Sequence, residues 1–168
     1  MQPISSNLHE AEYQTLRSLF YSDKNIALHH RDGYMALKAL LPPHPQRGMV
    51  FIDSPFEKED ELTQLKTALQ WGLEKWPTGT YVIWYPIKNN HQHILLLKNI
   101  RALGIEMLNA KILVTENVTS TQLTGTGMVI LNPPWQFAEE LKILLPYLWS
   151  RLSSQQQGNY QIETAHHL

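Results

Sequence analysis

The sequence contains no cysteine, and this absence excludes several kinds of site. Neither disulfide bonds nor thiolate zinc sites can form, and cysteine usage gives no information about the redox compartment. Long apolar runs are also missing, since none approaches the ~20 residues that a membrane-spanning helix needs. Met1 to Ser6 lack the basic and apolar regions of a signal peptide. We therefore expect a cytoplasmic protein with no membrane partner.

An excess of charge of one sign is missing as well. The chain has 14 Lys and Arg against 15 Asp and Glu, a formal net charge of −1. Without a global basic field, a nucleic-acid partner would have to be held by a local patch. Hydrophobic residues make up 43% of the 168 residues, enough for the core of one ordinary domain or of part of a larger one. We expect a partial domain over residues 1–152 and a polar tail over 153–168.

Apolar periodicity predicts helices that alternate with strands. Such alternation indicates a mostly parallel sheet with right-handed crossovers. Residues 116–125 contain no helix, so the strands on either side of them should form an antiparallel hairpin. The expected helices are 9–20, 34–41, 57–76, 90–103 and one ending near 151; the expected strands are 26–28, 49–52, 80–85, 105–115, 126–131 and a short one at 160–163.

The stretch from Gly48 to Glu57 is the one around which the chain is organised. Four consecutive apolar residues, Met49 to Ile52, predict a strand that is covered on both faces. Asp53 follows at the carboxyl end of this strand, where open α/β sheets bind their ligands. Pro55 stiffens the exit and fixes Asp53 relative to Phe56. A strand that simply ends in a turn is the structural alternative.

Two proline-aromatic turns occur in the chain, Asp53-Ser54-Pro55-Phe56 and Asn132-Pro133-Pro134-Trp135. Both resemble a signature of amino-group methyltransferases, and the second is the closer match in letters. If the strand of residues 126–131 is antiparallel to the others, Asn132 lies at the opposite edge of the sheet from Asp53. We therefore predict that the second turn is structural and starts a helix near Pro134.

Three strand ends should meet at the edge that carries Asp53. His30 to Gly33 follow one strand, Asp53 to Phe56 the next, and Trp84 to Pro86 the third. Asp53 and a backbone carbonyl of Ser54 or Pro55 would accept hydrogen bonds from an adenine amine, while Phe56 stacks on the base. Lys88 and neighbouring basic residues are a candidate phosphate-contacting patch, with a solvated helix face as the alternative.

Short strings in order over residues 6–150 carry a family resemblance. The chain resembles the bacterial 23S ribosomal RNA adenine-N6 methyltransferases of the RlmJ type, also described as proteins involved in catabolism of external DNA. The matching strings are Leu8-His9, Asp32-Gly33, Leu41-Pro42-Pro43, Arg47-Gly48, Ile52-Asp53, Pro55-Phe56-Glu57, Thr78-Gly79-Thr80-Tyr81, Trp84-Tyr85-Pro86, Gly104-Ile105, Gly127-Met128 and Asn132-Pro133-Pro134-Trp135.

The resemblance implies a Rossmann-like class I methyltransferase sheet, mostly parallel with a C-terminal antiparallel hairpin and missing the first strands. It implies S-adenosyl-L-methionine as cofactor, an adenine of ribosomal RNA as substrate, and no metal. The site residues that it implies are Asp53, Ser54, Pro55 and Phe56 for catalysis, Asp32, Gly33 and Asn7 for the cofactor, and Trp84, Tyr85 and Lys88 for the substrate.

The chain departs from the family pattern at points that matter for activity. The family's glycine-rich cofactor loop has no counterpart, because Gly125-Thr126-Gly127 stands between two late strands. Asn7 stands where an acidic residue is expected, and Ser54 replaces the first proline of the catalytic turn. Missing central strands would leave unpaired backbone groups in the sheet. We therefore expect an unstable chain, a homo-oligomer, or an amino-terminal partner segment.

Three functions follow as hypotheses. The first is S-adenosylmethionine-dependent N6-methylation of an adenine in 23S ribosomal RNA, impaired by the truncation. The second is a non-catalytic remnant or binding module of the same fold, and the third is a DNA-handling role in the use of external DNA. Histidine pairs such as His91 and His93 do not support a metal site, because they point to different sides of a helix.

Overall fold

The structure is a computed structural model, which describes residues 4–6, 10–54, 56, 60–88, 92–115, 122–153 and 156–165. It divides into two compact units. Unit 1 comprises Met1–Gly48 and Thr63–Pro77, and unit 2 comprises Met49–Leu62 and Thr78–Leu168. Among the described residues, no helix is long and apolar enough to cross a membrane.

The described part of unit 1 buries apolar residues in its second and third helices, among them Leu65 and Leu69. Its two strands pair in parallel, with Ile4 opposite Ala27. Helix α1 buries none of its residues, while α2 buries Ala36 and Leu37. The first strand was not predicted, because a single apolar residue carries no periodicity. The elements are β1 (Ile4–Ser6), α1 (Glu10–Leu19), β2 (Ala27–His29), α2 (Gly33–Leu40) and most of α3 (Glu61–Lys75).

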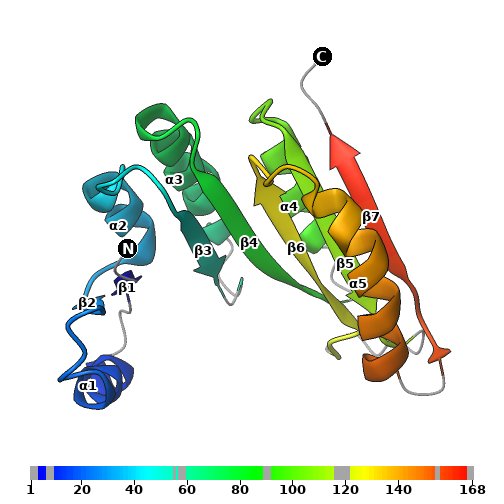
Figure 1. Cartoon of the computed structure of the whole chain (residues 1–168), viewed down its shortest axis with the longest axis horizontal. Coiled ribbons are helices and arrows are strands. Elements are labelled where there is room, and N and C mark those ends of the chain that lie inside the picture. The colour runs from blue at the N-terminus through cyan, green and yellow to red at the C-terminus, as the bar shows by residue number, and fades with distance from the viewer. Residues whose placement is uncertain are drawn as a thin grey trace. The chain divides into compact units, whose positions relative to one another are not determined.

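Unit 2 is built on a five-stranded mixed sheet with the order β3-β4-β6-β5-β7 (Figure 1). β3 runs parallel to β4, while β6 runs antiparallel to both β4 and β5. This confirms the Rossmann-like α/β fold with a late antiparallel hairpin. The elements are β3 (Met49–Asp53), β4 (Thr80–Ile87), α4 (Gln92–Arg101), β5 (Met107–Leu113), β6 (Gly125–Leu131), α5 (Phe137–Leu152) and β7 (Tyr160–Ala165).

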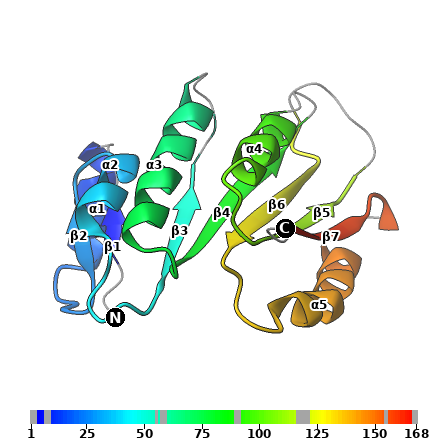
Figure 2. The same cartoon turned by 90° about the horizontal axis from the view of Figure 1, so that it is seen from above.

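The two helices of this sheet lie on opposite faces, as Figure 2 shows. On one face α5 packs Leu141 and Leu145 against strand residues that include Leu108 and Ile130. On the other face the ring of Tyr85 stacks beside α4, which buries its apolar residues Leu96, Leu97 and Ile100. Alternating side chains of β4 therefore serve two different cores.

Two expectations about the strands differ from the structure, the burial of β3 and the extent of the last strand. β3 was predicted to be buried on both faces, which is wrong: Met49 is 61% exposed and Phe51 is 51% exposed. Met49, Phe51 and Asp53 point to the same face of β3, and this face is the exposed one; β3 is also the edge strand of the sheet in the described part of the chain. The predicted polar tail includes β7, which pairs with β5 and confirms and extends the short strand expected at residues 160–163.

Candidate functional site

The turn after β3 is anchored at both of its described ends. Asp53 lies opposite Trp84 in the parallel ladder, and it is exposed. The hydroxyl of Ser54 donates a hydrogen bond to the carboxylate of Glu61, which is buried at the start of α3. Phe56 has a left-handed backbone with φ of 52° and is 7% exposed. Pro55 lies outside the described residues, so its predicted role stays a prediction.

A small pocket opens beside this turn, at the end of β4. Its space is about 10 Å³, the room of about one water molecule. A ring of the size of a purine therefore does not fit inside it. The ring of His93 stacks parallel to that of Tyr85, with centroids 6.4 Å apart. The lining residues are Phe56, Leu62, Tyr85, Pro86, Lys88, Gln92, His93 and Leu96.

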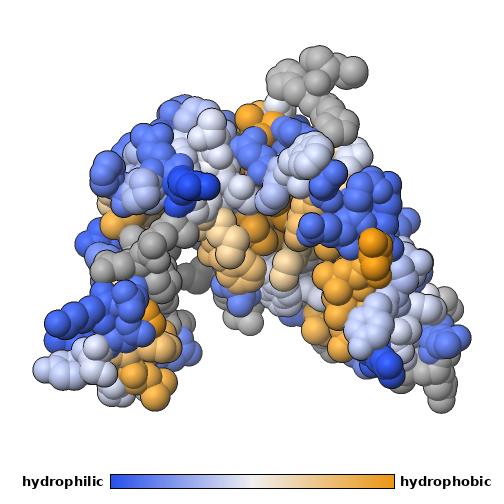
Figure 3. Space-filling model, viewed as in Figure 1, coloured by the Kyte–Doolittle hydropathy of each residue, from blue (hydrophilic) through white to orange (hydrophobic). Residues whose placement is uncertain are grey.

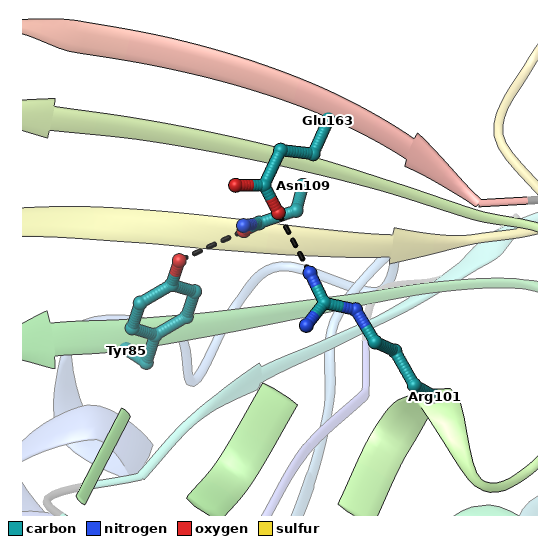
Figure 4. Close-up of polar contacts among 4 residues, drawn as sticks. All are labelled: Tyr85, Arg101, Asn109 and Glu163. Carbon is teal, nitrogen blue, oxygen red and sulfur yellow. Dashed lines mark hydrogen bonds and ion pairs between the residues drawn. The ribbon is translucent and has the colours of Figure 1, made fainter. Parts of the chain in front are cut away.

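The side chain of Tyr85, which lines this pocket, is directed towards Asn109 (Figure 4). Its hydroxyl donates to Oδ1 of Asn109 at 2.8 Å, and both side chains are almost fully buried. Burial raises the pKa of Tyr85 to about 12; the nearby Glu163 acts in the same direction, while the bond to Asn109 and the charge of Arg101 oppose it. Arg101 itself is paired with Glu163 at 2.7 Å.

Because Gly127 has no side chain, the ring of Tyr85 can occupy the space beside it. A Cβ atom at Gly127 would lie 2.2 Å from Cζ of Tyr85, so no larger residue fits without moving the ring. Gly125 is equally constrained, because its Cβ would lie 2.2 Å from the carbonyl oxygen of Ile112. Both glycines lie within β6, where they serve packing and form no ligand loop at a strand end.

The predicted substrate residues are only partly brought together. Tyr85 and Lys88 line the same pocket as Phe56, whereas Trp84 is not among its lining residues. Trp84 alternates with Tyr85 along β4 and therefore faces the α5 side of the sheet. The sequence reasoning missed two residues that contact the site, Glu61, which bonds to Ser54, and Asn109, which bonds to Tyr85 from another strand.

The turn after β6 lies at the other end of the sheet, as predicted. Because β6 is antiparallel, its last residue Leu131 pairs with Tyr81, at the beginning of β4. Nδ2 of Asn132 donates to the carbonyl of Gly79 at 2.8 Å, and the hydroxyl of Thr80 donates to the carbonyl of Asn132 at 3.0 Å. These two hydrogen bonds connect the turn after β6 to the beginning of β4, so the turn has a structural role. Helix α5 begins at Phe137, slightly later than expected.

The predicted cofactor residues belong to unit 1. Asp32 caps α2, with its Oδ1 accepting a hydrogen bond from the backbone nitrogen of Met35 at 2.9 Å. Gly33 is the first residue of α2, and no atom lies within 4 Å of a Cβ placed there. Asn7 lies outside the described residues. The cofactor roles of all three stay predictions.

The described residues fit S-adenosylmethionine only in part. A capping carboxylate, Asp32, follows one parallel strand, and an exposed one, Asp53, ends another. The described strands offer no glycine-rich loop for the methionine part, since Gly125 and Gly127 are packed inside the sheet. Groups of three side chains that could hold a metal ion are also absent from the described ranges.

A mixed sheet with a late inverted strand, and an acidic proline-aromatic turn at a parallel strand end, define a protein of the Rossmann-like methyltransferase class. The model of one family, described as "Ribosomal RNA large subunit methyltransferase D, RlmJ", matches residues 2–165. The chain belongs to this family. The resemblance expected from the short strings is thereby confirmed.

Curated relatives agree with this family. A Haemophilus influenzae protein named "Ribosomal RNA large subunit methyltransferase J" is 35% identical over 161 residues, covering 95% of this chain and 57% of the relative. The Escherichia coli K12 protein of the same name is 32% identical over 148 residues, covering 88% of this chain and 53% of the relative. The chain thus spans a little over half the length of these relatives.

Solved structures show the same fold. A crystal structure of a Legionella pneumophila protein matches with a TM-score of 0.88 and 30% identity, covering 98% of this chain and 61% of that one. A structure titled precorrin 8w decarboxylase, from Methanobacterium thermoautotrophicum, matches with a TM-score of 0.50 and 11% identity, over 77% of this chain and 69% of that one. The second likeness concerns the fold alone.

Proposed function

We propose that this chain is part of a ribosomal RNA methyltransferase that transfers a methyl group from S-adenosyl-L-methionine to the N6 amine of an adenine. The observation that carries the proposal is the acidic turn of Asp53, Ser54 and Phe56, at the carboxyl end of a parallel strand and beside a pocket, in a chain of this family. Ribosomal RNA as substrate and the cytoplasm as location rest on the names of the relatives.

The residues of the turn match what an adenine amine requires. The lone pair of this amine is delocalised into the ring, so the amine reacts well only when its hydrogens are held and its nitrogen is aligned. Asp53 is exposed and can accept a hydrogen bond from the amine. Phe56 lines the neighbouring pocket, where a base at the rim would meet its ring. When bound, S-adenosylmethionine supplies an electrophilic methyl group.

The charge and the small size of the pocket both favour a nucleotide within a longer RNA over a free small molecule. Lys88 brings a positive charge next to Phe56 and Tyr85, within reach of a phosphate beside the base. The pocket itself is too small for the base, so the remaining contacts must come from the rim and from the target RNA. Such enzymes act on a base that has left its stack, which is cheapest in single-stranded RNA.

The test is methyl transfer from labelled S-adenosylmethionine to protein-free large-subunit ribosomal RNA, with DNA of matched length as the competing substrate. The Haemophilus influenzae relative serves as the positive control. We expect labelled N6-methyladenine in the RNA and a loss of label with Asp53→Ala, while calorimetric binding of the cofactor persists. Transfer to DNA instead would support the DNA-handling role.

The non-catalytic remnant is the second candidate, and one observation favours it: the described residues supply only part of a cofactor site. Isothermal titration separates the two candidates. Absence of cofactor binding, together with absence of methyl transfer, would refute the enzyme proposal in favour of the remnant.

A further inference from the structure

A second and larger pocket lies along helix α1, wholly within unit 1. Its space is about 390 Å³, which is within the range of small-molecule sites. It is lined by the aromatic residues Tyr13, Phe20 and Tyr21, the charged residues Arg17 and Asp23, and two aliphatic residues. We call it the α1 pocket. None of these residues belongs to the predicted catalytic, cofactor or substrate sets, so the pocket needs an explanation of its own.

The aromatic residues of the α1 pocket are presented to solvent. Tyr13, Arg17 and Phe20 are spaced by four and three residues, so they lie on one side of the helix. Helix α1 nevertheless buries none of its residues. Phe20 is 39% exposed and Tyr21 is 86% exposed. Figure 3 shows hydrophobic and hydrophilic side chains exposed side by side at the lower left, where Figure 1 places α1. These rings are therefore accessible for stacking.

Local contacts hold both ends of the α1 pocket. The ring of Tyr13 stacks on that of His30, with centroids 4.9 Å apart and 20° between the planes. At the other end, the backbone nitrogen of Asp23 donates to the carbonyl of Phe20 at 3.1 Å. The backbone nitrogen of Ile26 in turn donates to the carbonyl of Asp23 at 3.2 Å. Because the walls are positioned without a ligand, binding loses less conformational entropy.

The two charged groups of the pocket retain bonding capacity. Among the described residues, Arg17 has neither an ion pair nor a hydrogen bond. Oδ1 of Asp23 accepts from the backbone nitrogen of Asn25 at 2.9 Å, which leaves Oδ2 for a ligand. Ile26 and Leu28 add an apolar wall. A matching ligand therefore has a flat ring, N–H donors for a carboxylate, and an anionic group for a guanidinium.

A guanine nucleotide combines these three properties. Its base stacks on aromatic rings, and base stacking on such side chains is a main source of affinity for single strands. Its N1–H and its N2 amine are neighbouring donors that a carboxylate accepts together, whereas the other bases lack this pair of donors. Its phosphate is the preferred partner of an arginine. The exposure of Tyr21 leaves one side of the pocket open, so the nucleotide can remain part of a chain.

We propose that the α1 pocket binds an unpaired guanine nucleotide of RNA, as a contact separate from the methyl-transfer site. Phe20 and Tyr21 stack on the base, Asp23 accepts its N–H donors, and Arg17 contacts a phosphate. The pocket belongs to unit 1, whereas the turn of Asp53 belongs to unit 2. The choice of RNA as the source of the nucleotide rests on the proposed function, while the chemistry of the pocket does not.

The test of base recognition uses the full chain and labelled single-stranded RNA pentamers with one central base, UUGUU, UUAUU and UUUUU, followed by fluorescence anisotropy at low salt. We expect UUGUU to bind about 10-fold more tightly than the other two, since a paired set of hydrogen bonds to one base discriminates by about this much. Asp23→Asn keeps an oxygen for the bond from Asn25 but turns donors towards the base. It should abolish the preference for UUGUU and leave the other two affinities unchanged.

Two further variants test stacking and charge. Tyr21→Ala should weaken all three pentamers about 5-fold or more, because stacking is independent of base identity. Arg17→Gln should also weaken all three, and it should reduce the slope of log affinity against log salt by about 0.7, the value for one phosphate contact on a single strand.

Helix α5 offers matched controls for both variants. Arg151 lies over the ring of Tyr147, 5.4 Å from its centroid, and Tyr147 is 58% exposed. Tyr147→Ala and Arg151→Gln remove the same residue types outside the α1 pocket, and they should leave all affinities unchanged. Because Arg17 and Tyr21 are exposed, their variants should keep the melting temperature of the wild type.

The outcomes separate this proposal from the proposed function. A guanine preference that Asp23→Asn abolishes, in a chain without methyl transfer, supports the pocket and counts against the enzyme. Methyl transfer with equal affinities for the three pentamers overturns the pocket and leaves the enzyme standing. Losses with Arg17→Gln but none with Tyr21→Ala overturn the pocket in favour of a surface phosphate contact. Tighter binding of free GMP than of UUGUU overturns RNA as the source of the nucleotide.

Discussion

The turns after β3 and after β6 follow a similar pattern, an acidic or amide residue, then proline, then an aromatic residue, but they differ in their surroundings. Asp53 is exposed, beside a pocket formed by Phe56 and Tyr85. Asn132 is engaged with the backbone of Gly79 and Thr80 at the opposite end of the sheet. The difference follows from strand direction, because β3 is parallel to β4 and β6 is antiparallel to it. Strand direction therefore decides at which end of the sheet each turn lies.

The largest expected effect separates the two turns by activity. Asp53→Ala should lower methyl transfer to ribosomal RNA by about 100-fold or more, since it removes the acceptor that aligns the amine. Asn132→Ala should leave transfer per folded molecule within about 2-fold of the wild type, because that turn lies at the other end of the sheet. If both variants lost methyl transfer to a similar extent at equal folded fraction, the two turns would not differ in their role in activity.

The next effect concerns the wall of the first turn's pocket. Gly127→Ala should destabilise the chain by about 1–3 kcal/mol, because the added methyl group overlaps the ring of Tyr85, which the bond to Asn109 holds. Gly33→Ala is the matched control: it has open space, and alanine at the start of α2 should be neutral or stabilising. Urea unfolding measures both. Equal stability of Gly127→Ala and wild type would show that the ring moves freely.

The second turn should reveal its structural role through stability. Asn132→Ala loses the bond to Gly79 and places alanine at a φ of 50°, so we expect a cost of about 1–2 kcal/mol. Asn132→Gly also loses the bond but accepts the left-handed backbone, so it should cost less. Calorimetry on this series checks the order. An unaffected melting temperature in Asn132→Ala would contradict a structural role.

A smaller effect is expected from the link between the first turn and α3. Ser54→Ala removes the hydroxyl that bonds to Glu61, and it should cost about 1 kcal/mol. The double variant with Glu61→Gln should cost less than the sum of the two single variants, since the residues share one interaction. A double-mutant cycle by urea unfolding measures this coupling. Strict additivity would mean that the contact contributes nothing to the turn.

The smallest effect appears only at alkaline pH. The pKa of Tyr85 is raised to about 12, so the unfolded chain releases this proton near pH 10 while the folded chain keeps it. Stability should therefore be unaffected below pH 10 and fall between pH 10 and 12. Tyr85→Phe should make that decline shallower without removing it, because the pKa of Tyr81 is also raised to about 12. An unchanged decline would place the phenol of Tyr85 in solvent.

Local patterns predicted the fold well where periodicity and connection length decide it. The alternation of apolar segments gave the α/β class, and the short connection over residues 116–125 gave the antiparallel hairpin. Those two facts also predicted that Asn132 and Asp53 end up at opposite ends of the sheet. β1 was not predicted, because a strand of three residues with one apolar residue shows no apolar periodicity.

The site was harder to predict, because its contacts join distant parts of the chain. Asn109 on β5 fixes Tyr85 on β4, and Gly127 on β6 makes room for the ring. The register of β4, β5 and β6 brings Tyr85, Asn109 and Gly127 together, and no short sequence motif predicts that register. The exposure of Phe51 was misjudged for a related reason: an apolar run indicates a strand suited to burial, but whether a neighbour is present depends on the rest of the sheet.

The most direct test of the account compares the two turns in one sample. Hydrogen exchange of the chain is followed with and without a fragment of large-subunit ribosomal RNA in the presence of S-adenosylhomocysteine. We expect RNA-dependent protection in peptides that contain Asp53 and Phe56 and in those around Tyr85 and Lys88, with none around Asn132. Protection confined to the turn after β6 would contradict it.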